Sequence, residues 1–269
     1  MSNTDIKLVA LDVDGTIMDK RFQISSRVKK AIYAASEKGV RVLIATGRMY
    51  SATVPIGRKL GIETPLITYQ GSLIKEFYKS DKTLLHYDLE TELAYRIIQD
   101  ARQKNLQINI YLDDKLYIEN ESPILQEYID RREIPFYKVN SFEERKNFKP
   151  TKILVMDSDT AKIERIVGEF KEKFSNELNI TKSTDYFCEF INKKCSKADG
   201  INFLAKKWGI DQSEIMAIGD HDNDREMLDF AGLGVAMGNS HDNLKEIANY
   251  VTDTVNNDGA ALAIEKFIL

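Results

Sequence analysis

The stretch IKLVALDVDGT, residues 6–16, decides the fold, because it is a short apolar run that ends in two aspartates and a glycine. In an open parallel sheet, ligands bind beyond the carboxyl ends of the strands. We therefore expect Asp12 and Asp14 to project into a ligand site. The alternative is a strand-to-loop turn, in which the aspartates cap backbone amides and Gly15 relieves the bend.

Apolar runs alternate with helix-like stretches through the first part of the chain, over residues 6–11, 25–38, 40–45, 50–60 and 66–68. The last part repeats this alternation, with helices expected at 197–208 and 224–230 and strands at 215–218 and 234–237. Such alternation is the signature of βαβ units. We predict an α/β fold whose two ends form one doubly wound, Rossmann-like parallel sheet.

The middle of the chain has a different pattern, in which helices at 92–103 and 161–174 are mixed with alternating strands. Strands expected at 107–112 and 115–119 flank Asp113 and Asp114, a two-residue hairpin turn. Hairpins imply antiparallel pairing, so this part is predicted to be an inserted α+β cap module. The expected organisation is a core over 1–82 and 191–269 with the insert at 83–190.

The composition is that of an ordinary globular protein, with 269 residues, 43% hydrophobic and 30% charged. A net charge of -4 without a basic stripe argues against a nucleic-acid partner. The polar start of the chain and the absence of a membrane-length apolar run predict no signal peptide, no membrane association and a cytoplasmic location. Cys188 and Cys195 lack metal or redox spacing and are expected to be unpaired thiols.

Three further polar groups are candidates for the same site. Thr46, Gly47 and Arg48 follow an apolar run, and a hydroxyl with free amides at a helix start suits a phosphate oxygen. The loop 219–224, GDHDND, offers hard oxygen donors of the kind that Mg2+ prefers. Lys197 begins the helix before the strand at 215–218. Taken singly, these residues have ordinary roles as helix caps or solvated charges.

Their placement at the ends of separate strands favours one shared site, and the chemistry that fits it is phosphoryl transfer. Mg2+ between carboxylates and phosphate would neutralise charge. We assign Asp12 as the nucleophile that forms an acyl phosphate, and Lys197 and Thr46 as the groups that hold phosphate oxygens. Asp14 would protonate the leaving oxygen, which requires a pKa raised towards neutrality by the neighbouring carboxylate.

These motifs together resemble the haloacid dehalogenase superfamily, and within it the Cof-like phosphatases. The similarity rests on residues 12–16, DVDGT, on 46–48, TGR, on Lys197 and on 219–224, and it continues through 236–239, AMGN. The resemblance implies that Asp12 and Asp220 bind Mg2+ by side chain and Asp14 by its backbone carbonyl. It also implies that Asn223 or Asp224 supports the metal and that Asn239 lies near the phosphate, with Asn223 a further phosphate contact.

The sequence departs from the family pattern at Gln70, Ala198 and His221, so the substrate does not follow from the resemblance. The family suggests a small phosphorylated metabolite and in the first place a sugar phosphate, with flavin mononucleotide and pyridoxal phosphate as alternatives. The expected assembly is a monomer or a small homo-oligomer. Two alternatives stay open: a phosphotransferase or phosphomutase on the same core, and a non-hydrolytic phospho-aspartate signalling receiver.

Overall fold

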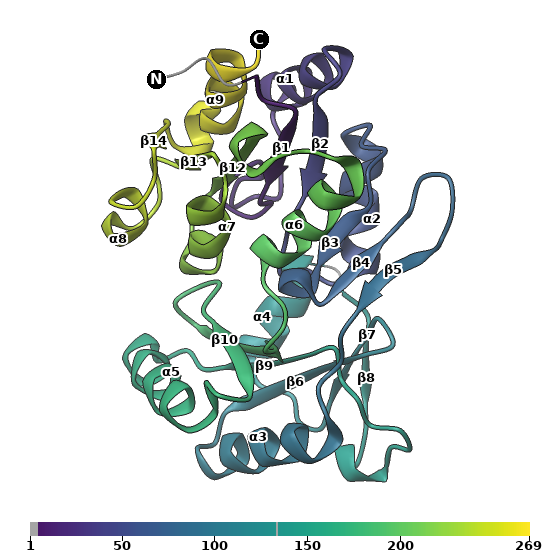
Figure 1. Ribbon diagram of the computed structural model, residues 1–269. Coiled ribbons are helices and arrows are strands. Elements are labelled where there is room, and N and C mark those ends of the chain that lie inside the picture. The colour runs from purple at the N-terminus through teal and green to yellow at the C-terminus, as the bar shows by residue number, and fades with distance from the viewer. Residues whose placement is uncertain (1–4, 133) are drawn as a thin grey trace.

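The computed structural model describes residues 5–132 and 134–269, and in it a parallel sheet lies above a second, larger sheet (Figure 1). The parallel sheet has the strand order β14-β13-β12-β1-β2. Its strands are β1 (Leu8–Leu11), β2 (Arg41–Ile44), β12 (Ile215–Gly219), β13 (Leu233–Ala236) and β14 (Tyr250–Val251). The two ends of the chain therefore build one parallel sheet, as predicted.

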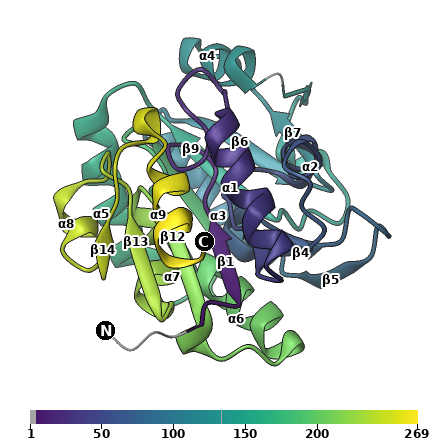
Figure 2. The ribbon, with the colours of Figure 1, turned by 90° about the horizontal axis from the view of Figure 1, so that it is seen from above.

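Helices cover both faces of this sheet, which explains why its strands consist almost entirely of apolar residues (Figure 2). On one face, Val9 and Leu11 pack into a cluster with α1 (Ser26–Glu37) and α9 (Gly259–Phe267). On the other, Leu8 and Ala10 pack with α6 (Lys197–Trp208) and α7 (Arg225–Phe230). Two further helices, α2 (Tyr50–Lys59) and α8 (Asp242–Lys245), follow β2 and β13. The predicted doubly wound α/β class is confirmed.

The strand register brings the candidate residues to one edge of the sheet. Leu11, the last residue of β1, pairs with Ile44 of β2 on one side and with Ile218 of β12 on the other. The residues that follow these three strands therefore leave the sheet at the same level. The chain extends from β1 to opposite sides in its two halves, which makes this edge a topological switch point.

A small antiparallel sheet follows, with the order β3-β4-β5. It consists of β3 (Leu66–Thr68), β4 (Leu73–Lys75) and β5 (Thr83–His86), and a bridge between Ala45 and Ile67 joins it to the end of β2. The expected start of the insert, residue 83, is thus the first residue of a strand that pairs with β4.

The larger sheet has the order β10-β11-β9-β6-β7-β8 and is antiparallel except between β7 and β8. Its strands are β6 (Gln107–Leu112), β7 (Lys115–Ile118), β8 (Phe136–Lys138), β9 (Lys152–Met156), β10 (Leu178–Thr181) and β11 (Phe187–Asn192). Helices α3 (Thr91–Gln103) and α5 (Thr160–Phe174) cover the face away from the parallel sheet, and α4 (Pro123–Arg132) lies between β7 and β8 in sequence (Figure 1). We refer to this six-stranded unit with its helices as the insert.

The β6–β7 hairpin of the insert reaches the other part of the molecule through its turn. Asp113 and Asp114 have φ angles of 53° and 54°, as a two-residue turn of the primed type requires. The Asp114 carboxylate accepts hydrogen bonds from the backbone N–H groups of Tyr50 (3.0 Å) and Ser51 (2.9 Å). The N-cap of α2, Met49, makes no such bond with its own side chain. The insert therefore caps a helix of the parallel-sheet unit.

Two further predictions from the sequence concern the cysteines and membrane-spanning helices. Cys188 and Cys195 are buried free thiols, which confirms that they are unpaired. Within 5–132 and 134–269, no helix has both the length and the apolar character needed to cross a bilayer.

We expect Asp114→Gly to lower the free energy of unfolding by about 1 kcal/mol, the usual value of a helix cap. Glycine keeps the left-handed turn conformation, so the loss reports the carboxylate. The measurement is urea denaturation, and Asp113→Gly in the same turn is the matched control. Equal stabilities of the two variants would contradict the capping role.

Candidate active site

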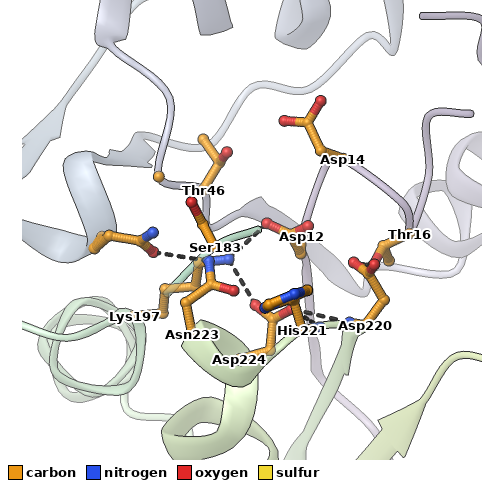
Figure 3. A network of polar contacts seen from close by, with 12 residues as sticks. Asp12, Asp14, Thr16, Thr46, Ser183, Lys197, Asp220, His221, Asn223 and Asp224 are labelled. Atoms are coloured by element: carbon orange, nitrogen blue, oxygen red, sulfur yellow. Dashed lines mark hydrogen bonds and ion pairs between the residues drawn. The ribbon is translucent and has the colours of Figure 1, made fainter. Parts of the chain in front are cut away.

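Three carboxylates and one ammonium form the centre of the site (Figure 3). Asp12 follows β1, Asp220 follows β12, and Asp224 ends the short 3-10 turn Asp222–Asp224. One oxygen from each carboxylate lies within 4.8 Å of the others. The Lys197 Nζ donates to Asp12 Oδ1 and to Asp224 Oδ1, each at 2.6 Å. The structure thus brings together four of the residues that the sequence suggested.

The charges of this group do not balance. When all three carboxylates are ionised, the one ammonium leaves two negative charges uncompensated in a largely buried place. Burial raises the pKa of Asp12 to about 7, although the Lys197 charge acts in the opposite direction. Burial and the charge of Asp12 also raise the pKa of Asp220 well above its usual value. A divalent cation with a preference for oxygen ligands, such as Mg2+, would remove this excess, so the residues present fit the metal.

Asp224 holds the loop that carries Asp220. Its second oxygen, Oδ2, accepts from the backbone N–H groups of Asp220 (2.9 Å) and His221 (3.1 Å). The helix that Asp224 was expected to begin starts at Arg225, one residue later. Because both Asp224 oxygens already accept hydrogen bonds, this side chain organises the site more than it faces a ligand.

Three residues surround Asp220 and help to hold its side chain, namely Gly15, Thr16 and Asn239. The Thr16 hydroxyl donates to Asp220 Oδ1 at 3.0 Å. The Asn239 amide donates to the Gly15 carbonyl at 3.0 Å and accepts from the Val255 N–H at 2.8 Å. Gly15 has φ +84°, and a Cβ there would lie 2.2 Å from Asp220 Oδ2. Only glycine fits this position. Thr16 positions Asp220, a role that the sequence did not predict although Thr16 is part of the DVDGT motif.

Asp14 corrects one expectation. Its carboxylate points away from the three carboxylates of the centre (Figure 3) and accepts from Arg48 Nε (2.7 Å) and Nη2 (2.6 Å). Burial alone would raise the pKa of Asp14, but the hydrogen bonds and charge of Arg48 outweigh it, and the pKa is lowered. The expectation of a raised pKa for Asp14 was therefore wrong. The sequence shows that another carboxylate is near, but it does not show that Arg48, which follows a different strand, contacts Asp14.

The loop of Thr46, Gly47 and Arg48 is not a helix start. Thr46 is buried, and its hydroxyl accepts from the Arg48 N–H at 3.2 Å instead of capping α2. Helix α2 begins at Tyr50, and Asp114 already accepts from its first N–H groups. The expectation that this helix end would help to hold phosphate is therefore wrong, and the Thr46 hydroxyl and the loop amides are what the site offers here.

A second polar network covers the site from the insert. Glu189 of β11 accepts from Gln70 Nε2 (2.7 Å) and from the Ser183 hydroxyl (2.7 Å). The Nζ of Lys152, on β9, lies 3.4 Å from Glu189 Oε1 and donates to the Gly47 carbonyl at 2.7 Å. Sequence reasoning missed Lys152, Ser183 and Glu189. The available signal was a single charged residue in each of two mainly apolar strands, KILVM and FCEFIN.

Asn223 connects this network to the centre of the site. Its Nδ2 donates to Gln70 Oε1 at 3.2 Å. Its Oδ1 is buried and has no hydrogen-bond partner within the described part of the chain. A buried acceptor without a donor is costly, so this oxygen is available to a ligand group.

Comparison with known proteins agrees with this geometry. The family model described as haloacid dehalogenase-like hydrolase matches residues 9–264. The chain belongs to this family. A Bacillus subtilis protein named 5-amino-6-(5-phospho-D-ribitylamino)uracil phosphatase YcsE is 32% identical, over 99% of this chain and 98% of its own. Phosphatase YwpJ of the same organism is 28% identical, over 95% and 98%.

A solved structure supports the same assignment. The crystal structure of a haloacid dehalogenase-like hydrolase from Bacteroides thetaiotaomicron is 30% identical and covers 97% of this chain and 99% of its own, with a TM-score of 0.84. The predicted family and the predicted enzyme class, a phosphatase, are both confirmed.

The raised pKa of Asp12 leads to a prediction for the metal-free protein. Because the pKa is about 7 in the folded state and 3.8 in the unfolded state, protonation stabilises the fold, and this contribution is lost as the pH rises towards 7. We expect the free energy of unfolding to fall by about 2 kcal/mol between pH 5.5 and 8 from this group.

The measurement is urea unfolding in EDTA across that pH range. Asp12→Asn cannot ionise and should lack this part of the slope, whereas the exposed control Asp242→Asn should keep it. Identical pH slopes in the wild-type protein and Asp12→Asn would show that Asp12 ionises normally.

Proposed function

We propose that the chain is a Mg2+-dependent phosphomonoester hydrolase that works through a phospho-aspartate on Asp12. The observation that carries this proposal is the group of Asp12, Asp224 and Lys197, which are buried, with the partly buried Asp220, because it holds three carboxylates against one ammonium. Mg2+ would be held by the Asp12 and Asp220 side chains and the Asp14 main chain, with Asp224 and Asn223 in support. When bound, it neutralises charge on the carboxylates and the phosphate.

Asp12 is the nucleophile in this proposal. Lys197 holds Asp12 Oδ1, so Oδ2 attacks the phosphorus and the ester bond to the leaving oxygen breaks. Lys197, the Thr46 hydroxyl, the Gly47 amide and Asn223 provide donors for the phosphate oxygens, and Asn239 keeps the Gly15 loop in place. Water then attacks the phosphorus of the acyl phosphate, which releases phosphate and restores Asp12.

Asp14 is the proposed general acid for the leaving oxygen and the general base for the attacking water. It can serve only when Arg48 releases it, since the arginine holds it as an anion. The phosphate of the substrate is itself a partner for the Arg48 guanidinium. Substrate binding would thereby free Asp14 and raise its pKa at the step that needs the proton.

We further propose that the insert is a cap that selects a sugar or sugar-alcohol phosphate. The polar groups of Lys152, Ser183 and Glu189 lie over the Gly47 loop and can exchange their mutual bonds for substrate hydroxyls. The 32% identical relative named as a phosphatase of a phospho-ribitylamino compound supports a polyol phosphate as the substrate class. Lys152 and Glu189 are both 3% exposed, so water is largely excluded there.

The test is phosphate release from a panel of sugar, sugar-alcohol and cofactor monophosphates, with Mg2+ and with EDTA. We expect Mg2+-dependent turnover that Asp12→Asn lowers by a factor on the order of 10³ or more. Asp242→Asn serves as a folded control.

Two other outcomes would replace the proposal. A phosphate-labelled Asp12 that persists without turnover would support the signalling receiver. Phosphate that appears on an added sugar hydroxyl, with little free phosphate, would support the phosphotransferase.

The pairing of Asp14 with Arg48 gives a pH prediction. Arg48→Gln removes the positive charge, so the pKa of Asp14 should rise. Because the general acid must be protonated and kcat/KM reports the free enzyme, in which Arg48 still holds Asp14, the alkaline limb of the kcat/KM profile should move upward by about one pH unit or more. Arg58→Gln on the outer part of α2 is the matched control. An alkaline limb that stays in place in Arg48→Gln would exclude Asp14 as the group that limits activity there.

A further inference from the structure

A second group of metal-ligating side chains lies where the insert meets the parallel-sheet unit. Asp185, His221 and His241 each provide one ligand atom, and these atoms lie within 4.8 Å of one another. Asp185 comes from the β10–β11 connection of the insert, His221 from the loop after β12, and His241 precedes α8. We propose that these three residues bind a divalent transition metal of the zinc type and that this metal links the insert to the catalytic loop.

The hydrogen bond of His221 supports this proposal independently of the spacing. His221 Nδ1 lies 3.0 Å from the backbone carbonyl of Lys182. A carbonyl can only accept, so Nδ1 carries the proton and the lone pair of the neutral ring is on Nε2. Metal-binding histidines typically have this arrangement, in which one ring nitrogen donates to a carbonyl and the other binds the metal.

The other two ligands can adjust to a metal. The His241 and Asp185 residues are exposed, and the His221 and His241 rings are 5.2 Å apart at 55°, so they are not stacked face to face. A tetrahedral zinc ion needs its ligand atoms roughly 3.3 Å apart, which requires only small rotations of these side chains. Asp185 is 3.5 Å from Lys182, whose ammonium also pairs with Glu164 and therefore stays paired if Asp185 turns to the metal.

The ligand types decide which metal fits. Two imidazoles and one carboxylate suit Zn2+, Co2+ or Ni2+, whereas the oxygen-only group of Asp12, Asp220 and Asp224 suits Mg2+. The two sites should therefore select different metals from the same solution.

A metal at this place would hold the molecule closed. Asp185 and the Lys182 carbonyl belong to the insert. His221 directly follows Asp220, and its backbone N–H donates to the Asp224 carboxylate. Linking them restricts separation of the insert from the active site, and lid opening commonly limits product release. Zinc should accordingly slow turnover, a consequence that rests on the proposed phosphatase function and cap role.

The binding test is calorimetric titration of the full chain with Zn2+ in saturating Mg2+. We expect one zinc to bind, and His241→Ala to weaken its affinity by roughly 100-fold or more, beyond the loss of an outer-shell partner. His86→Ala is the matched control, because the third histidine of the chain contacts Asp88 and Thr151 instead. Asp220→Asn should bind zinc as the wild type does.

Equal zinc affinity in the wild-type protein and His241→Ala would overturn the site. So would a loss of zinc binding in Asp220→Asn alone, since it would place the zinc among the carboxylates. These results do not depend on phosphatase activity.

The effect on turnover is measured separately, as phosphate release in Mg2+ with and without Zn2+. We expect zinc to lower the rate several-fold in the wild-type protein and His86→Ala, and His241→Ala to keep its zinc-free rate and resist the inhibition. Equal inhibition of His241→Ala and the wild-type protein would refute the link between this site and closure.

Discussion

The structure depends on the buried ion pairs that Lys197 makes with Asp12 and Asp224, at 2.6 Å each. Asp12 belongs to the first part of the chain, whereas Lys197 and Asp224 follow the insert, so the contact of Lys197 with Asp12 joins residues 185 positions apart. Removing one partner from a buried pair typically costs about 3–5 kcal/mol, because it leaves an uncompensated charge. The charges of Asp12 and Asp224 keep the pKa of Lys197 above its usual value despite its burial. The ammonium is therefore always available to hold the site together.

The burial of these charged groups also prepares the site to bind a cation. The fold tolerates an excess of negative charge at the end of β1 because α6 places a lysine there and because main-chain N–H groups satisfy Asp224. The negative charge that these contacts leave uncompensated can be balanced by a bound cation. The polar network of Gln70, Lys152 and Glu189 above it joins insert and core without filling the site with apolar groups. Gly47 permits this contact, since a Cβ there would lie 2.3 Å from Gln70 Nε2.

Local patterns predicted much of this architecture, and long-range side-chain pairs account for what they missed. The helix at 197–208 and the hairpin around Asp113 were predicted correctly, because periodicity and turn chemistry act over a few residues. The acidic centre was also predictable, since strand ends of a parallel sheet meet at one edge. The pairing of Arg48 with Asp14 and the capping of α2 by Asp114 were not, because each joins residues that share no local pattern. Strands β4 and β5 were not predicted.

The central claim is that Asp12 carries the phosphoryl group during turnover. It is tested most directly by rapid acid quench of the wild-type enzyme with a phosphate-labelled substrate and Mg2+, followed by peptide mapping of the label. The account predicts label on the peptide that contains Asp12, formed and lost at rates compatible with turnover, and no label in Asp12→Asn. Turnover without any labelled enzyme, or label on another residue, would contradict it.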